Sequence, residues 1–130
     1  MILVDTHVVA WLALDPDRLS KAAKTAIDEA RKSGGGLAIS DISLFELAVL
    51  FRKKRITLDI SLEHFLAEVE ARFLVLPMTS RICVRALGFA ADYPKDPADR
   101  IIVATALAEG LSLLTADREI RRSKAVTTIW

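Results

Sequence analysis

The sequence has one cysteine and lacks any hydrophobic run long enough to cross a bilayer. Cys83 cannot form an internal disulfide, and within the apolar triplet Ile82-Cys83-Val84 we expect it to be a small core residue without a catalytic role. The longest apolar runs fall well short of the ~20 residues that a transmembrane helix needs, and no basic leader precedes the first apolar segment. We therefore expect a soluble protein in a reducing cytosol, with no membrane association.

Histidine is also scarce, and neither sign of charge dominates. The two histidines form no convincing Ser-His-Asp or Cys-His set for nucleophilic catalysis. The 18 Lys and Arg residues and the 17 Asp and Glu residues leave a net charge of +1, which excludes no class of partner. Basic residues cluster at Arg52-Lys53-Lys54-Arg55 and across Arg118, Arg121, Arg122 and Lys124. At both clusters, phosphate binding and an ordinary solvated surface remain open.

The chain has the length of a single domain, residues 1–130. A domain of 130 residues buries roughly two-thirds of its unfolded surface, so it needs neither a disulfide nor a structural metal to fold. Its hydrophobic content of 52% and mean hydropathy of +0.34 are high for a soluble monomer. This excess suggests that some apolar surface is buried against another subunit.

The first residues form a short apolar run that ends at an acidic residue. Met1 to Val4 are four apolar residues, which predict a strand buried on both faces at the centre of a parallel sheet. Asp5 then lies at the carboxyl end of this strand, where ligands bind in open α/β sheets. Asp5 or Thr6 can equally be the N-cap of the helix predicted over residues 8–14.

Apolar strands and amphipathic helices alternate along the rest of the chain. Further strands are predicted at 37–40, 73–76, 111–115 and 126–130. Helices are predicted from Ser20 to the glycines at 34–36, from 42 to about 55, from 62 onwards after Ser61, from 79 to about 91, and from 101 to 109. The alternation predicts an α/β fold with a central parallel sheet of four to five short strands and helices on both faces.

Acidic residues recur at matching places in this pattern. Asp5 and Asp117 directly follow predicted strands, Glu46 lies in the first turns of the helix after the second strand, and Asp96 and Asp99 begin the helix before the fourth. Because the carboxyl ends of parallel strands meet at one edge of a sheet, all of these side chains can reach a common site.

Each position also has a purely structural explanation. Glu46 can complete a capping box with Ser43, or lie on the solvated polar arc of its helix. Asp96 as N-cap, Pro97 at the first helical position and Asp99 at the third make a well-formed helix start without any metal. The residues alone leave both interpretations open.

A cluster of carboxylates is tenable only when its charge is neutralised. Two carboxylates ~4 Å apart repel each other by about 4 kcal/mol at an effective dielectric constant of 20. Since neither His nor Cys belongs to the acidic set, the suited cation is a hard one, Mg²⁺ or Mn²⁺.

Four short motifs occur in a recognisable order. They are Asp5-Thr6-His7, Ser43-x-x-Glu46, Asp96-Pro97-Ala98-Asp99-Arg100 and Thr115-Ala116-Asp117. Together they resemble the motifs of the PIN-domain ribonucleases, specifically the VapC-type toxins of bacterial toxin–antitoxin pairs. The resemblance spans nearly the whole chain and implies one PIN-like three-layer domain over residues 1–130. One departure is that Pro94-Lys95 stands where many relatives carry a histidine.

The resemblance also implies a site, a reaction and partners. The implied catalytic and metal-binding residues are Asp5, Glu46, Asp99 and Asp117. Thr6 and Thr115 would support them through their hydroxyl groups, and Asp96 would be the helix cap. The implied reaction is metal-dependent hydrolysis of RNA phosphodiesters by a water that Mg²⁺ or Mn²⁺ activates. The implied partners are the RNA substrate, a cognate antitoxin protein over the acidic groove and a second copy of the chain in a homodimer.

Other classes of protein fit the acidic pattern less well. A phosphoacceptor receiver domain should carry paired acids after its first strand and a lysine at the end of its last. A phosphatase with an aspartate nucleophile should carry a second Asp where this chain has His7. A PIN-fold RNA-binding or RNA-processing module without toxin activity remains the alternative.

Overall fold

A computed structural model describes residues 1–90 and 93–130, and its centre is a parallel sheet. The five strands in this part of the chain are β1 (Ile2–Val4), β2 (Leu37–Ser40), β3 (Leu74–Leu76), β4 (Leu113–Leu114) and β5 (Thr128–Ile129). Their order across the sheet is β3-β2-β1-β4-β5, and each neighbouring pair is parallel. The predicted parallel sheet is therefore confirmed.

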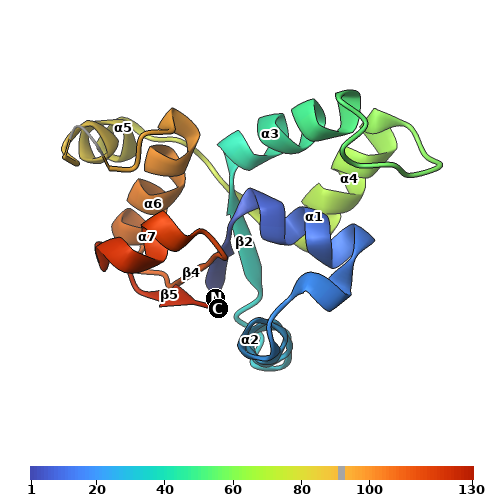
Figure 1. Cartoon of the computed structure of the whole chain (residues 1–130), viewed down its shortest axis with the longest axis horizontal. Helices are drawn as coiled ribbons and strands as arrows, with labels where there is room; N and C mark the ends of the chain where they lie inside the picture. Colours follow the sequence, from blue (N-terminus) through green and yellow to red (C-terminus); the bar gives the residue numbers. More distant parts are fainter. Residues whose placement is uncertain (91–92) are drawn as a thin grey trace.

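Helices cover both faces of this sheet. They are α1 (Thr6–Leu14), α2 (Lys21–Lys32), α3 (Asp41–Arg52), α4 (Leu62–Arg72), α5 (Ser80–Leu87), α6 (Pro97–Glu109) and α7 (Arg118–Ser123), with a 3-10 turn, η1, at Pro16–Arg18. In Figure 1, α1 to α4 lie on one side of β2, and α5, α6 and α7 lie on the other. This is the predicted three-layer α/β architecture. No helix in the described part of the chain is long and apolar enough to span a membrane.

The middle strand, β1, contributes to two hydrophobic clusters, one on each face of the sheet. Leu3 and Val4 are fully buried, and successive side chains of a strand point to opposite faces of a sheet. Val4 packs in the core beneath α1, α2 and α4, whereas Leu3 packs with Ile102 and Val103 of α6. The chain that leaves β1 at Asp5 therefore emerges between the two helical layers.

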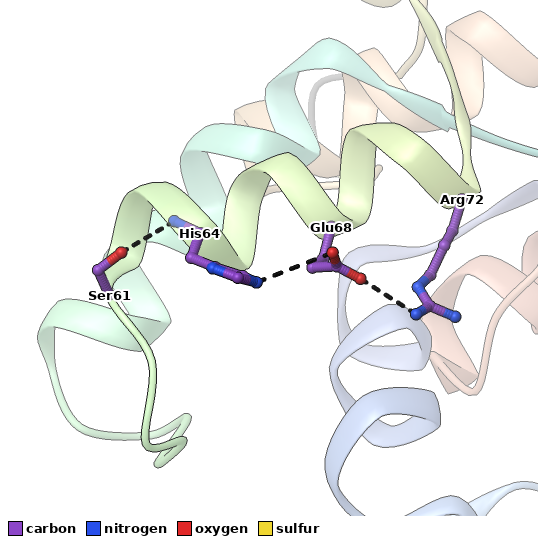
Figure 2. Close-up of polar contacts among 4 residues, drawn as sticks. All are labelled: Ser61, His64, Glu68 and Arg72. Carbon is purple, nitrogen blue, oxygen red and sulfur yellow. Dashed lines mark hydrogen bonds and ion pairs between the residues drawn. The ribbon is translucent and has the colours of Figure 1, made fainter.

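The exposed side of α4 carries charged side chains that are paired with one another. The helix begins after Ser61, as predicted, and the Ser61 hydroxyl caps it by accepting a hydrogen bond from the His64 N–H (Figure 2). Glu68 forms an ion pair with Arg72 at 3.0 Å and lies 3.8 Å from the His64 imidazole. Each partner stands four residues from Glu68, one helical turn, so the chain itself supplies a cation for Glu68, the Arg72 guanidinium.

The C-terminal ends of α6 and α3 differ in how well the sequence predicted them. α6 ends at Glu109, as predicted, and its C-cap Gly110 adopts the left-handed conformation with φ of 65°. α3 ends at Arg52, three residues before the predicted end at about 55. The early end follows from the turn through Lys54, which is also left-handed with φ of 58°.

α5 differs from the sequence prediction in its length and in the environment of Cys83. The predicted helix extended to about residue 91, which lies outside the described residues, whereas α5 ends at Leu87 with Gly88 as its C-cap. Glycine is a poor helix former, which favours this end. The prediction of a buried Cys83 is wrong, because the side chain is exposed. The buried stripe of α5 is Ile82 and Ala86, and Cys83 points about 100° away from Ile82 around the helix.

Candidate functional site

Acidic side chains gather at the carboxyl edge of the sheet, where the strand order reverses. From the central β1, the sheet extends to β2 on one side and to β4 on the other, an arrangement that leaves a crevice outside the strand ends. A pocket of about 230 Å³ lies here, lined by Asp5, His7, Trp11, Glu46, Asp96, Asp99, Ala116 and Asp117. The structure thus brings together all four acidic residues of the predicted site, along with Asp96.

Asp5 is held at the end of β1 by hydrogen-bond donors on both of its carboxylate oxygens. Its Oδ1 accepts a hydrogen bond from the Thr6 N–H at 2.8 Å, and its Oδ2 accepts one from the Thr115 hydroxyl at 2.7 Å. Asp5 is therefore both the N-cap of α1 and a wall of the pocket. Thr115 in turn accepts a hydrogen bond from the Asp117 N–H at 3.0 Å, which ties the end of β4 to Asp5. Asp117 caps α7 by accepting a hydrogen bond from the Ile120 N–H at 3.0 Å.

Glu46 reaches the pocket from the second turn of α3. Its Oε1 accepts a hydrogen bond of 2.6 Å from the Thr6 hydroxyl, which is also hydrogen-bonded to the Ser43 hydroxyl at 2.9 Å. The capping-box interpretation is wrong, because the N-cap of α3 is Ser40. The solvated-arc interpretation does not describe Glu46 either, because this residue is half-buried and hydrogen-bonded to Thr6. The polar side chains of Ser43 and Glu46 instead face the start of α1.

The first turn of α6 supplies two carboxylates in different surroundings. Asp96 is the exposed N-cap and accepts hydrogen bonds from the N–H groups of Ala98 at 2.8 Å and Asp99 at 3.4 Å, as predicted. Asp99, the third residue of the helix, is half-buried, and none of the described residues donates a hydrogen bond to its carboxylate. Since Asp96 alone caps the helix, the Asp99 carboxylate remains free to bind a ligand.

Burial and mutual repulsion raise the pKa values of the carboxyl groups in the pocket. Burial is the largest cause for Asp5, Glu46 and Asp99, because the charged form loses its hydration. The charges of the four other pocket carboxylates add to this effect at Asp99, whose pKa rises to about 7. Threonine hydrogen bonds oppose the rise in the pKa of Asp5 and of Glu46. Protons or a bound cation would therefore stabilise these carboxylates at neutral pH.

The donor set suits a hard divalent cation that keeps part of its water shell. Carboxylate oxygens dominate the pocket, which has no cysteine and one histidine, His7. Across residues 1–90 and 93–130, no three His, Cys, Asp or Glu side chains stand close enough to form a ready-made metal site. Mg²⁺ does not require one, since it usually keeps several waters and binds one or two carboxylates together with substrate phosphates. The residues present therefore fit this type of cation.

His7 and Trp11 also line the pocket, although the sequence patterns assigned neither of them to the site. They stand one turn apart on α1, with ring centroids 6.3 Å from each other. Trp11 also contacts Trp130 at 5.7 Å, and the Arg18 guanidinium lies 4.3 Å above its ring. For Trp11 the available signal was its helical spacing from His7, which belongs to the Asp5-Thr6-His7 motif, since residues four apart share one face of a helix.

Arg100 fastens the segment that leads into α6. Its guanidinium donates hydrogen bonds to the carbonyl oxygens of Pro94 at 2.6 Å, Ala90 at 2.6 Å and Ala86 at 3.3 Å. The planar fork of an arginine can serve several carbonyls at once, which a lysine ammonium matches poorly. Because Arg100 directly follows Asp99, these contacts fix the start of α6 beside the pocket.

Comparisons with known proteins agree with this geometry. The chain matches the model of the PIN domain over residues 2–125. Ribonuclease VapC22 of Mycobacterium tuberculosis is 37% identical over 131 residues, which cover 99% of this chain and 98% of that protein. A DNA-bound VapBC structure from Salmonella typhimurium has a TM-score of 0.71 at 21% identity, and a toxin–antitoxin complex from Klebsiella pneumoniae has a TM-score of 0.68 at 23% identity. Each of these two alignments covers 98% of this chain and 97% of the other.

The fold and the pocket define a class of protein, a three-layer α/β domain with carboxylates clustered at the carboxyl edge of a parallel sheet. The chain belongs to the PIN-domain family, and its full-length similarity to VapC22 groups it with the VapC-type ribonucleases of that family. The resemblance inferred from the four sequence motifs is thereby confirmed.

Proposed function

We propose that this protein is an Mg²⁺- or Mn²⁺-dependent endoribonuclease and the toxin of a toxin–antitoxin pair. The observation that carries the proposal is a single pocket that holds Asp5, Glu46, Asp99 and Asp117, none of which forms an ion pair with another described residue. Carboxylates without compensating charge destabilise the free protein, and a divalent cation that binds the folded state would offset this cost. Membership of the PIN-domain family and similarity to a ribonuclease support RNA as the substrate.

In this proposal each pocket residue has a defined task. Asp5 and Asp99 are the principal metal ligands, because Asp5 is held rigidly by two hydrogen bonds and the Asp99 carboxylate has no donor among the described residues. Glu46 and Asp117 complete the acidic set. A divalent cation held there would lower the pKa of a water molecule and stabilise negative charge on the scissile phosphate. Hydrolysis in such a site requires no protein nucleophile, in keeping with the absence of a Ser-His-Asp set.

The biological setting of the proposal draws on the relatives. The similar structure from K. pneumoniae is a toxin–antitoxin complex, and we extend this to a cognate antitoxin as a partner of the present chain. Phe45, Val84 and Leu87 are 67%, 72% and 82% exposed, which supports a homodimer that covers apolar surface. We place the protein, as one PIN domain over residues 1–130, in the cytoplasm with its RNA substrate.

The proposed activity is tested by cleavage of single-stranded RNA with purified protein. Wild-type protein should cut RNA in millimolar Mg²⁺ or Mn²⁺ and should stop cutting in EDTA. Asp5→Asn should lower the rate by roughly 100-fold or more, since it weakens the hold on the ion. Asp17→Asn is a matched control on the exposed turn η1 and should cut at the wild-type rate. Wild-type protein that cuts no cellular RNA with either metal would overturn the proposal.

Two further measurements separate the proposal from its alternative and test the assembly. Cleavage without growth arrest on expression would favour an RNA-processing module over a toxin, and binding without cleavage would favour an RNA-binding module.

Sedimentation at micromolar concentration should show a dimer. A monomer, with or without metal, would contradict the homodimer.

A further inference from the structure

Three arginines line a groove on α7 and β5. Arg118, Arg121 and Arg122 stand at positions i, i+3 and i+4 of a helix and so share one face, and with Thr128 they line an open groove of about 460 Å³. Among the described residues, none of these three guanidinium groups forms an ion pair or a hydrogen bond. The groove therefore presents three positive charges that the chain leaves uncompensated.

The groove adjoins the acidic pocket along two routes. Asp117 lines the pocket and directly precedes Arg118, which lines the groove, so their Cα atoms are about 3.8 Å apart. Thr128 lines the groove, and two residues later Trp130 contacts Trp11 of the pocket wall, with ring centroids 5.7 Å apart. The groove and the pocket are therefore neighbours, linked at the start of α7 and at the end of β5.

This pairing of opposite charges suits a chain of phosphodiesters. A cation at the carboxylates serves the phosphate that reacts, but the neighbouring phosphates of the strand still face an acidic pocket. Arginine binds phosphate oxygens through parallel N–H donors, and the Thr128 hydroxyl can add another. Glu119, the acidic residue among the arginines of α7, lines a different depression with Tyr93, Arg122 and Ser123.

We propose that the groove of Arg118, Arg121, Arg122 and Thr128 binds the RNA phosphates that flank the bond cleaved in the acidic pocket. The inference rests on RNA as the substrate, as proposed above. The proposal assigns different roles to the two basic clusters of the sequence. The cluster from Arg52 to Arg55 begins about 9 Å beyond Glu46 along the axis of α3, and none of its residues lines the pocket. That second cluster is a solvated surface and serves as a matched control.

The salt dependence of RNA binding tests this assignment. Fluorescence anisotropy of a labelled single-stranded RNA oligonucleotide, in EDTA so that no cleavage occurs, gives the dissociation constant over a series of salt concentrations. Each phosphate contact to single-stranded RNA contributes about 0.7 to the slope of log affinity against log salt. The triple variant Arg118→Gln/Arg121→Gln/Arg122→Gln should therefore lose about 2 from the magnitude of this slope. The variant Arg52→Gln/Lys53→Gln/Lys54→Gln should keep the wild-type slope.

The outcomes that overturn the proposal are distinct from those that overturn the nuclease. A triple variant that keeps the wild-type slope would overturn the assignment of the groove to RNA phosphates. All the altered side chains are exposed, so thermal melting should show an intact fold in both variants. Because binding is measured without metal, protein that binds RNA through these arginines yet cuts none would refute the nuclease and leave the groove in place.

Discussion

Glu68 on α4 and Asp99 on α6 are both helical carboxylates, yet the chain surrounds them in opposite ways. Glu68 is exposed and has Arg72 at 3.0 Å and His64 at 3.8 Å (Figure 2). Asp99 is half-buried among other carboxylates, and its pKa rises to about 7. A carboxylate that the chain neutralises itself adds little beyond a surface ion pair. One that is left uncompensated in a pocket is suited to bind a cation from solution.

The largest difference between the two carboxylates should appear in catalysis. Asp99→Asn should lower RNA cleavage in Mg²⁺ by roughly 100-fold or more, because a neutral amide holds the ion weakly. Glu68→Gln removes a helical carboxylate that already has a cationic partner, Arg72, and should leave cleavage unchanged. Rates measured on one RNA substrate under single-turnover conditions make the comparison. Equal cleavage rates for Asp99→Asn and the wild type would show that Asp99 is not a metal ligand and has only a structural role.

The next effect concerns stability against pH in the metal-free protein. The folded-state pKa of Asp99, about 7, lies above its ordinary value of 3.8, so the folded protein holds this proton more tightly than the unfolded chain. The free energy of unfolding should therefore fall as pH rises from about 4 to about 7, by on the order of 2 kcal/mol after allowance for solvent screening. Burial raises the pKa of Asp5 and of Glu46 in the same direction.

Urea unfolding in EDTA at several pH values measures this loss. Asp99→Asn should flatten the decline, whereas Glu68→Gln should retain it. A decline of the same steepness in both variants would show that Asp99 is not its source.

A smaller effect should follow from addition of metal. Mg²⁺ or Mn²⁺ at about ten times its dissociation constant should stabilise the folded state by about 1.4 kcal/mol, which corresponds to a rise in melting temperature of roughly 5 °C. The rise should shrink in Asp99→Asn and persist in Glu68→Gln, since only Asp99 faces the pocket. Melting curves of the wild type that do not move in millimolar metal would contradict the proposed metal site.

The smallest effect is expected for Asp96, which stands three residues before Asp99. Asp96 accepts hydrogen bonds from backbone N–H groups as an N-cap, and asparagine caps a helix about as well as aspartate. Asp96→Asn should therefore change the free energy of unfolding by less than ~0.5 kcal/mol and leave most of the cleavage activity. A loss of cleavage as deep as that of Asp99→Asn would instead assign Asp96 to the metal site.

Local sequence patterns were sufficient for most of the framework. The apolar run at the N-terminus predicted β1 as the central strand, and Ser61 and Asp96 predicted the starts of α4 and α6. These features depend on residues within a few positions of one another, so the sequence contains their whole physical cause. The alternation of strands and helices also predicted that Asp5, Glu46, Asp96, Asp99 and Asp117 can meet, because parallel strands bring their carboxyl ends to one edge. The choice of four of them as the site came from the resemblance to the PIN-domain ribonucleases.

The environment of each side chain in the site, in contrast, is decided by contacts between distant parts of the chain. The hydrogen bond from Thr6 to Glu46 spans 40 residues, and the one from Thr115 to Asp5 spans 110. The sequence alone could not choose between cap and pocket for Glu46, nor place Cys83 on the solvent side of α5. Burial, repulsion and the resulting pKa of Asp99 arise only when separate elements pack together, since they depend on distance through space and on exclusion of water.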